Sequence, residues 1–232
     1  MTITFITGAN KGLGRETARR LVELGHTVLL GARDPERGTE TAIALGARYV
    51  PIDVTDDSSV ADAAADVAEH EGSIDVLINN AGIHGPAGNP GALTGADALS
   101  VLDVNVAGAV RTITAFLPLL RRSPDPVIIN VSSGMGSLDH THDPARPESK
   151  VIAPAYTASK AALTMLTTQY AKAFPDIRVN AADPGYTATD LNGHSGPQTV
   201  TEGTDAIVAL ATEAPGAGSG RLVDRHGETT WS

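Results

Sequence analysis

The sequence predicts an α/β protein with one open, doubly wound sheet of seven mostly parallel strands and helices on both faces. Two observations predict this fold. Short apolar runs alternate with longer segments of helical character along almost the whole chain. Several of these runs also lack polar alternation, which is typical of parallel strands buried on both faces. Right-handed crossovers would wind such strands into a single sheet.

The strands are predicted where valine, isoleucine and leucine cluster. In chain order they are 3–7 (ITFIT), 27–32 (TVLLGA), 47–53 (ARYVPID), 74–80 (IDVLINN), 126–132 (PVIINVS), 177–183 (IRVNAAD) and 220–224 (GRLVD). Helices are predicted between them, near 13–24, 35–46, 56–71, 96–120, 155–174 and 199–212. The longest segment without clear periodicity is 134–154, which we expect to be a loop beside a site.

The composition indicates one domain over residues 1–232, because cores split only beyond about 250 to 300 residues. The formal net charge is −10 without a long basic run, so we expect no nucleic-acid partner. The chain has no cysteine, which excludes disulfides and thiolate metal sites and is compatible with the cytoplasm. We find no secretory leader and no apolar run near the ~18 to 20 residues of a membrane span. We therefore expect a cytoplasmic protein with no membrane partner.

A glycine-rich turn, TGANKGLG at 7–14, directly follows the first strand and opens the first helix. Gly8 permits the tight turn, Gly12 lets a phosphate approach the backbone, and Gly14 lets the helix pack against the strand. Amides at the helix N-terminus would donate to a pyrophosphate. A structural βα turn is the alternative, but the position at the first strand-to-helix switch favours a nucleotide.

The stretch YTASK at 156–160 places Tyr156 and Lys160 four residues apart, on one face of a predicted helix. A phenol has an ordinary pKa of about 10, too high for easy proton exchange at neutral pH. A cation ~4 Å away is worth about 4 kcal/mol at an effective dielectric near 20, or roughly three pKa units before desolvation. We therefore expect Lys160 to lower the pKa of Tyr156. The alternative is a half-buried tyrosine beside a lysine that covers apolar surface.

The chain resembles the short-chain dehydrogenase/reductase family through six motifs that occur in the family's order. They are TGANKGLG (7–14), NNAG (79–82), DVNVAG (103–108), NVSSGMG (130–136), YTASK (156–160) and DPGYTATD (183–190). The resemblance covers essentially the whole chain, and the combination is far more specific than any one motif. It implies a Rossmann-type fold and an NAD(P)-dependent oxidoreductase, similar to the carbonyl-reductase-like NADPH-dependent members.

The resemblance implies four catalytic residues. Tyr156 would exchange a proton with the substrate oxygen, while Lys160 lowers the pKa of Tyr156 and holds the nicotinamide ribose. Ser133 would orient the substrate oxygen, with Ser132 as the alternative. Asn105 would hold a water that links Lys160 to solvent as a proton relay. The hydride belongs to the cofactor, so the protein supplies positioning and electrostatics.

The resemblance also implies the residues that contact the dinucleotide. Pro184 and Gly185 would form the wall beside the nicotinamide, Thr187 and Thr189 would bond its carboxamide or the phosphates, and 53–54 would meet the adenine. The full implied set is Gly8, Asn10, Lys11, Gly12, Leu13, Gly14, Arg33, Asp53, Val54, Asn80, Ala81, Gly82, Tyr156, Lys160, Pro184, Gly185, Thr187 and Thr189.

Some of these polar residues also have a purely structural interpretation. Asn105 would then bond a helix backbone, and Ser133 would cap a turn. Asn79 and Asn80 would support the central sheet.

The end of the second strand, LLGARD, predicts NADP(H) rather than NAD(H) as the cofactor. An NAD-selective site usually places an acidic residue there for the ribose hydroxyl, whereas here Arg33 offers a guanidinium to a phosphate. Lys11 adds a second cation. Asp34 would invert the preference if it faced the ribose, but we expect it to cap the helix that begins at Pro35.

The chain departs from the common family pattern between its catalytic serine and tyrosine. Ser133 and Tyr156 are 23 residues apart, where about 12 is common. We interpret 134–154 as an inserted loop on the substrate side, and expect substrate contacts mainly from 83–95, 134–155 and 186–198.

Two histidines in this loop, His140 and His142, are followed by Asp143 and suggest a metal site. We find no credible third and fourth ligand for them in this irregular segment, so we predict no metal.

The leading hypothesis is an enzyme that interconverts a carbonyl and an alcohol in a small-molecule substrate, with NADP(H). One alternative is a catalytically silent dinucleotide-binding sensor. A nucleotide-sugar epimerase or dehydratase is the other, although those relatives usually open with TGxxGxxG. Neither the substrate nor the choice between monomer and homo-oligomer follows from the sequence.

Overall fold

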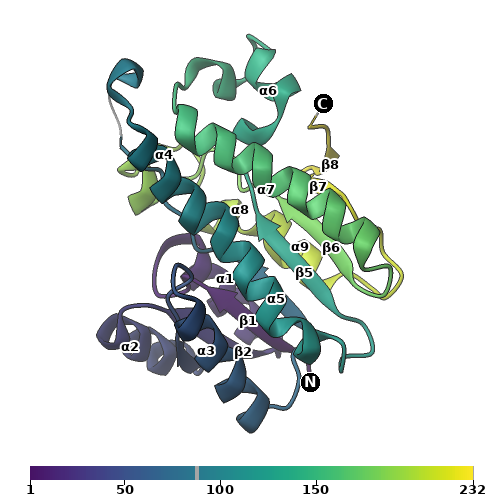
Figure 1. Cartoon of the computed structure of the whole chain (residues 1–232). Coiled ribbons are helices and arrows are strands. Elements are labelled where there is room, and N and C mark those ends of the chain that lie inside the picture. The colour runs from purple at the N-terminus through teal and green to yellow at the C-terminus, as the bar shows by residue number, and fades with distance from the viewer. Residues whose placement is uncertain (87–88, 232) are drawn as a thin grey trace.

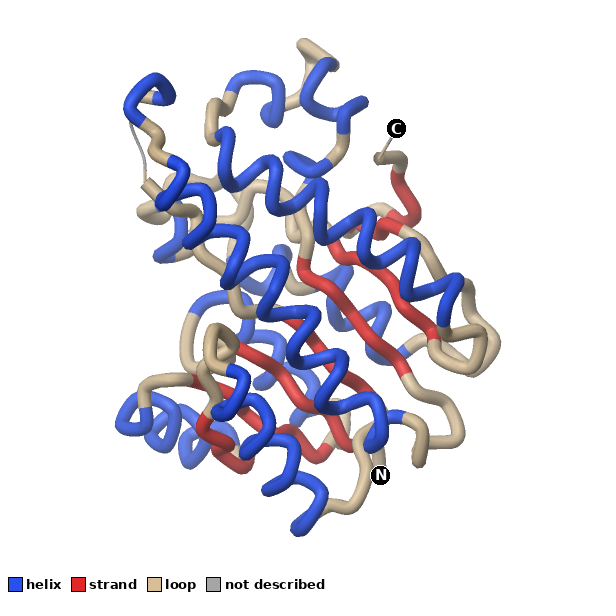
Figure 2. Tube along the Cα trace, in the orientation of Figure 1, coloured by secondary structure: helices blue, strands red, loops and turns tan. Residues whose placement is uncertain are grey.

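The computed structural model describes residues 1–86 and 89–231 and forms one sheet between two layers of helices (Figures 1 and 2). The strands are β1 (Ile3–Thr7), β2 (Thr27–Ala32), β3 (Arg48–Pro51), β4 (Val76–Asn79), β5 (Val127–Val131), β6 (Arg178–Ala182), β7 (Leu222–Asp224) and β8 (Gly227–Thr229). Their order in the sheet is β3-β2-β1-β4-β5-β6-β7-β8, and all neighbours are parallel except β7 and β8. The predicted doubly wound α/β fold is confirmed.

Helices follow the strands in the predicted alternation. They are α1 (Gly12–Glu23), α2 (Pro35–Leu45), α3 (Asp57–His70), α4 (Gly95–Leu102), α5 (Gly108–Leu120), α6 (Leu138–His142), α7 (Pro154–Ala173), α8 (Val200–Gly203) and α9 (Asp205–Thr212). A π-helical turn, η2 (Asp103–Ala107), joins α4 to α5, and short 3-10 turns are η1 (Pro90–Ala92), η3 (Gly134–Gly136), η4 (Pro147–Lys150) and η5 (Asp190–Asn192).

The described residues form eight strands, one more than the seven predicted. The additional strand, β8, returns antiparallel to β7 after a tight turn in which Asp224 Oδ1 accepts a hydrogen bond from the His226 amide at 2.7 Å. Gly227 follows that turn with φ +125°, a conformation that favours glycine. The three residues of β8 have no apolar pattern, so only backbone pairing with β7 reveals the strand.

The core consists of two apolar layers, one on each face of the sheet. On one face, α1, α2 and α9 cover the strands with side chains that include Leu21 and Ile207. On the other face, α3, α5 and α7 cover them, and Phe5 of β1 meets Phe116 of α5 with ring centroids 4.4 Å apart. Burial of one such ring contributes about 1.5 to 3 kcal/mol, so these layers fix the sheet edge that carries the site.

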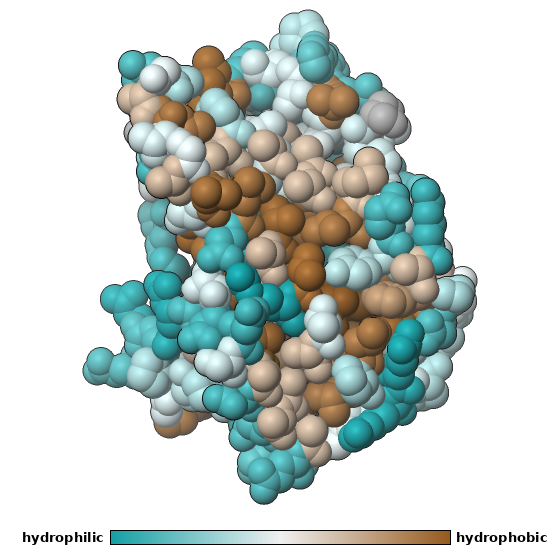
Figure 3. Space-filling view, viewed as in Figure 1, coloured by the Kyte–Doolittle hydropathy of each residue, from teal (hydrophilic) through white to brown (hydrophobic). Residues whose placement is uncertain are grey.

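The sequence analysis found no apolar run near the length of a membrane span, but the helical run Gly95–Leu120 reaches that length. It comprises α4, η2 and α5, 26 residues with a mean hydropathy of 1.3 in its most apolar window, which is enough by length and composition to cross a membrane. In this fold its Ile113 and Phe116 are buried against the sheet. Figure 3 shows hydrophobic residues gathered across the face that α4, α5 and α7 form. Leu99 of α4 and Met165 of α7 are exposed.

The segment 134–154, predicted as a loop, contains α6 and the turns η3 and η4. Gly136 packs against the α7 backbone, since a Cβ there would lie 2.7 Å from the Lys160 carbonyl carbon. The Leu138 amide donates to the Trp231 carbonyl at 3.2 Å. Helical turns of three to five residues are too short to give a periodic signal, which is why the sequence did not predict them.

Candidate functional site

A cavity of about 630 Å³ opens at the carboxyl ends of β1 to β4. β1 lies between β2 and β4, where the strand order reverses, and open α/β sheets bind ligands at that point. The cavity brings together thirteen residues of the predicted dinucleotide set: Gly8, Asn10, Lys11, Gly12, Leu13, Gly14, Arg33, Asp53, Val54, Asn80, Ala81, Gly82 and Thr189.

The glycine turn at one end of this cavity is held against the end of β4. Gly8 has φ +64°, and a Cβ on it would lie 2.9 Å from the Ala81 Cα, so both its conformation and its packing require glycine. The Asn80 amide nitrogen donates to the carbonyls of Thr7 at 2.8 Å and Gly8 at 3.0 Å. The structural interpretation of Asn80 is therefore observed directly, and it shapes the turn that lines the cavity.

Tyr156 and Lys160 lie in the first two turns of α7, which begins at Pro154. Both side chains are buried, at 9% and 5% exposure, and the Lys160 ammonium nitrogen lies 5.5 Å from the centroid of the Tyr156 ring. The ammonium donates to the Val131 carbonyl at 2.7 Å. The helical spacing thus places both groups on one face, as predicted, and the end of β5 anchors the lysine.

The pKa of Tyr156 differs from the sequence expectation. Burial raises it to about 12, and the nearby Asp183 charge adds to the effect, while a hydrogen bond with the Ser133 side chain opposes it. Burial lowers the pKa of Lys160 to about 8, against the effect of Asp183. We expected Lys160 to lower the tyrosine pKa, but burial is the largest cause of the shift and Lys160 is not among its causes.

The two adjacent serines point in different directions. The Ser132 hydroxyl is buried against α7, where it contacts the Lys160 carbonyl at 3.2 Å and the Thr164 hydroxyl at 2.8 Å. Ser133 is half-buried and accepts from the Met135 amide at 3.2 Å as the N-cap of η3, and its side chain lies near enough to the phenol to lower the pKa of Tyr156. Ser133 therefore both caps a turn and reaches the phenol.

Asn105 is buried within the π-helical turn η2. Its side chain accepts from the Ile83 amide at 2.8 Å and donates to the Ile83 carbonyl and the Ser159 hydroxyl, each at 2.9 Å. A Cβ on Gly82 would lie 3.4 Å from Asn105 Oδ1 and 3.8 Å from Lys160 Nζ, so Gly82 lies next to both side chains. Asn105 thus joins the loop after β4 to α7 beside the lysine.

Comparison with known proteins identifies the family. Residues 2–199 match the family described as short chain dehydrogenase. The chain belongs to this family. It is therefore an oxidoreductase of a family that acts on carbonyl or alcohol groups with a nicotinamide dinucleotide, and the resemblance seen in the six sequence motifs is confirmed.

Individual relatives cover almost the whole length of this short-chain dehydrogenase. It is 36% identical to "Short-chain dehydrogenase anuI" of Penicillium roqueforti (strain FM164), over 96% of this chain and 93% of that protein. It is 31% identical to (+)-neomenthol dehydrogenase of Arabidopsis thaliana, over 89% and 90%. The NADPH-bound carbonyl reductase from chicken fatty liver is 29% identical and similar in structure, with a TM-score of 0.88 over 99% of both chains.

Basic side chains line the larger cavity. Arg33 Nη1 lies 3.8 Å from Asp53 Oδ2, and Lys11 Nζ lies 3.3 Å from Asp190 Oδ2. Both basic side chains are mostly exposed, at 79% and 59%. They are therefore within reach of a ligand that enters the cavity.

Asp34 caps α2, as predicted from its position before Pro35. Its carboxylate accepts from the Arg37 amide at 3.1 Å, and it also approaches the Arg37 guanidinium at 3.6 Å. Arg37 lines the cavity as a third cation that the sequence analysis did not identify. Its position in the first turn of the helix after β2 could have indicated from the sequence that it lies near the cavity.

Four residues of the predicted set lie outside both cavities: Lys160, Pro184, Gly185 and Thr187. Gly185 has φ +67°, and its amide donates to Asp183 Oδ1 at 2.9 Å. The Thr187 hydroxyl is buried and donates to the Pro184 carbonyl at 2.9 Å. The Thr187 hydroxyl, predicted to bond the cofactor, is thus engaged in a hydrogen bond within the turn 184–187.

A smaller cavity of about 110 Å³ adjoins Tyr156. It is lined by His84, Pro86, Asn89, Pro90, Ala92, Leu93, Ile152, Ala153, Pro154, Ala155 and Tyr156. Apart from Tyr156, these residues come from two of the predicted substrate stretches, 83–95 and 134–155, although positions 87–88 lie outside the described residues. His84, which the sequence analysis missed, lines both cavities and stacks on the Tyr156 ring with centroids 5.1 Å apart.

Proposed function

We propose that this short-chain dehydrogenase interconverts a small carbonyl compound and an alcohol with NADP(H), and that Tyr156 donates and accepts the proton. The observation that carries this proposal is the buried phenol of Tyr156, which contacts Ser133 and lies close to Lys160 where the two cavities adjoin. A silent sensor has no need of such a proton donor.

The dinucleotide fits the larger cavity on three counts. Its volume of about 630 Å³ lies within the ~300 to 1,000 Å³ of typical cofactor sites. Gly8 and Gly12 both have positive φ angles and carry no side chain, which leaves backbone accessible at the start of α1, where a pyrophosphate would receive backbone hydrogen bonds. Basic side chains in the cavity lining complement a phosphate. When bound, the cofactor supplies or accepts the hydride.

In the reductive direction, Tyr156 would donate its phenolic proton to the carbonyl oxygen of the substrate. Its pKa of about 12 keeps the phenol protonated at neutral pH, which is the form that this step needs. The Ser133 hydroxyl would hold the same oxygen in place. Lys160, with a pKa of about 8, is mostly protonated at pH 7, and its charge would stabilise the phenolate that the transfer leaves behind.

The preference for NADP(H) rests on Arg33, Lys11 and Arg37. Arginine matches a phosphate with two parallel hydrogen bonds, and all three side chains line the larger cavity. Of the acidic residues in its lining, Asp34 uses its carboxylate to cap α2, while Asp53 pairs with Arg33 and Asp190 pairs with Lys11. The similarity to a carbonyl reductase that binds NADPH supports the same preference.

The substrate proposed is a small, mainly apolar ketone or aldehyde. The cavity beside Tyr156 is lined largely by alanine, proline, leucine and isoleucine, with His84 and Asn89 as its polar members apart from the tyrosine. Similarity to (+)-neomenthol dehydrogenase supports an alicyclic ketone or its alcohol as the first compounds to test.

The decisive experiment replaces Tyr156 with phenylalanine, which keeps the ring and removes the proton. We expect kcat for reduction of an alicyclic ketone to fall by at least about 100-fold, the usual scale for a general acid, with NADPH binding within a few-fold of wild type. Tyr170→Phe, on the same helix and outside both cavities, is the matched control and should keep wild-type activity.

Two results would reject the mechanism or the function. Substantial turnover by Tyr156→Phe would remove the tyrosine from its role. If the wild-type protein binds NADPH tightly but oxidises it with no ketone, aldehyde or quinone in a broad panel, the sensor hypothesis replaces the enzyme.

A further inference from the structure

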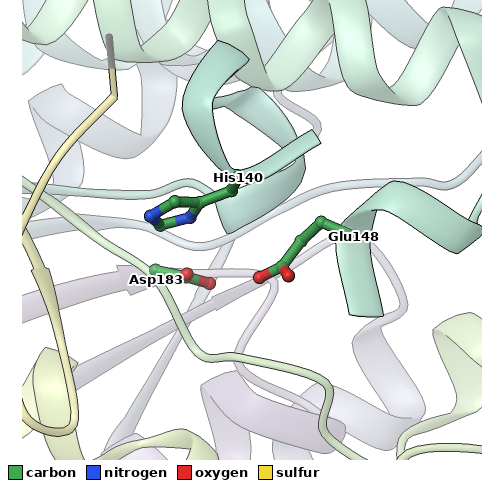
Figure 4. A group of neighbouring side chains, drawn as sticks. All are labelled: His140, Glu148 and Asp183. Carbon is green, nitrogen blue, oxygen red and sulfur yellow. The ribbon is translucent and has the colours of Figure 1, made fainter. Parts of the chain in front are cut away.

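Three side chains with metal-binding chemistry, the buried His140 and Asp183 and the half-buried Glu148, meet next to the proposed active site (Figure 4). His140 comes from α6, Glu148 from η4, and Asp183 from the loop that follows β6. One ligand atom from each lies within 4.8 Å of the others. Figure 4 shows the carboxylates of Asp183 and Glu148 turned toward each other, with the His140 ring beside them.

The space between these atoms is kept open by Gly134. A Cβ at this position would lie 2.5 Å from Glu148 Oε1, 2.8 Å from Asp183 Oδ2 and 3.0 Å from His140 Nδ1. The three atoms therefore surround one point, although their residues span 43 positions of sequence. Convergence of this kind from three separate elements is what a ligand set requires.

His140 supplies an independent sign that the cluster binds a ligand. The residue is 4% exposed, and its Nδ1 is buried without a hydrogen-bond partner among the described residues. The other ring nitrogen, Nε2, lies 3.1 Å from the Thr229 hydroxyl. A histidine that binds a metal through one nitrogen usually forms a hydrogen bond through the other, which fixes its ring, and Thr229 is placed to do this.

The charges of the cluster also favour a cation. Arg146 contacts both oxygens of Glu148, at 3.1 and 3.3 Å, and so supports that carboxylate from outside. Asp183 is 3% exposed and forms no salt bridge within residues 1–86 and 89–231. A buried carboxylate that faces a second carboxylate is unfavourable unless a cation or a proton lies between them.

We propose that His140 Nδ1, Glu148 and Asp183 form a three-ligand site for one Zn²⁺ ion. One imidazole and two carboxylates are a donor set that Zn²⁺ accepts, with a fourth position for water. The bound ion ties the segment 134–154 to the end of β6. His142, the partner that the sequence suggested for His140, is exposed and lies with Nδ1 2.8 Å from the Leu138 carbonyl, so it takes no part.

Zinc binding tests the site without any measurement of turnover. The full chain, free of any affinity tag and stripped of metal with a chelator, is titrated with Zn²⁺ in competition with a chromophoric chelator at pH 7. We expect one Zn²⁺ per chain. His140→Gln and Glu148→Gln should each weaken this binding by at least about 100-fold, because loss of a direct ligand exceeds the 10- to 100-fold effect of an outer contact.

The matched control is His142→Gln, which removes an exposed histidine two residues away and should bind Zn²⁺ within three-fold of wild type. Co²⁺ provides a second measurement, since a site with imidazole and carboxylate ligands should give a visible absorption band that is lost in His140→Gln. Circular dichroism checks that each variant is folded, and the two ligand variants test the site independently.

Two outcomes would overturn the proposal. If the wild-type chain takes up no stoichiometric Zn²⁺, the cluster holds a proton rather than a metal. If His142→Gln loses as much affinity as His140→Gln, the ion binds at the surface of α6 instead.

Discussion

Replacement of Arg33 with aspartate should turn the cofactor preference of this dehydrogenase toward NADH. The Arg33 guanidinium lies 3.8 Å from Asp53 Oδ2, and its side chain is 79% exposed at the mouth of the dinucleotide cavity. A 2′-phosphate in that cavity would be within reach of this cation. Aspartate at the same place would repel the phosphate and accept a hydrogen bond from an unmodified ribose hydroxyl.

The expected size of the effect follows from two contributions. Loss of a hydrogen bond to a charged group costs about 1.5 to 3 kcal/mol, and exposure of Arg33 argues for the lower value. Repulsion between a carboxylate and a phosphate ~4 Å apart adds about 1 kcal/mol at the dielectric of water. The sum, about 2.5 kcal/mol, corresponds to roughly a 60-fold loss in kcat/KM with NADPH. Lys11 and Arg37 stay in place, so NADPH binding should weaken but persist.

The assay measures kcat/KM for NADPH and NADH with one ketone substrate, in wild type and variant. Arg122→Asp is the matched control: it makes the same charge change on an exposed residue outside both cavities, and should leave the ratio of the two values unchanged. An equal or higher kcat/KM with NADH in the wild type would refute the assignment of NADP(H). An unchanged ratio in Arg33→Asp would show that Arg33 does not face the ribose.

Three further predictions concern stability and specificity. Lys160→Met should be inactive but more stable at pH 7, by on the order of 3 kcal/mol at most, because the wild type buries a charge whose pKa falls from 10.5 to about 8. The stability difference between the variant and the wild type, measured by chemical denaturation, should shrink between pH 8 and 10.5, because Lys160 loses its proton in the folded wild type before it does in the unfolded chain. A difference that stays constant over this range would contradict the lowered pKa of Lys160. Gly8→Ala should lower the free energy of unfolding by about 1 to 3 kcal/mol more than Gly46→Ala does, as measured by urea unfolding. Both glycines have φ near +65°, but only at Gly8 would an added Cβ clash with a neighbour. Ile152→Ala should lower kcat/KM for an apolar ketone about five-fold, or about 1 kcal/mol, without a change in Tm. Ile43→Ala, equally exposed on α2, should leave both unchanged, and equal kinetic effects would remove Ile152 from the substrate site.

The sequence by itself determined the order of the elements and the edge of the sheet at which the site forms. Apolar runs such as 3–7 and 127–131 are buried on both faces whatever surrounds them, so their composition already marks parallel strands. The glycine turn and the YTASK spacing are also local features. Backbone sterics determine that Gly8 can adopt a positive φ, and the helical repeat places Tyr156 on the same face as Lys160.

Only the tertiary structure decided properties that depend on neighbours distant in sequence. Ser132 and Ser133 are adjacent in sequence, and packing of the first against α7 leaves the second to meet Tyr156. The pKa of Tyr156 rises because the completed fold removes water from it, a cost that a spacing of four residues does not reveal.

The cluster of His140, Glu148 and Asp183 illustrates the same limit. The sequence drew attention to His140 and His142, which share a short helix, but the fold buries the first and exposes the second. The partners of His140 come from η4 and from the end of β6, and β6 is placed by its pairing with β5 and β7. Local periodicity determines which residues lie on one face of an element, whereas contacts between elements depend on packing over the whole chain, which no single segment encodes.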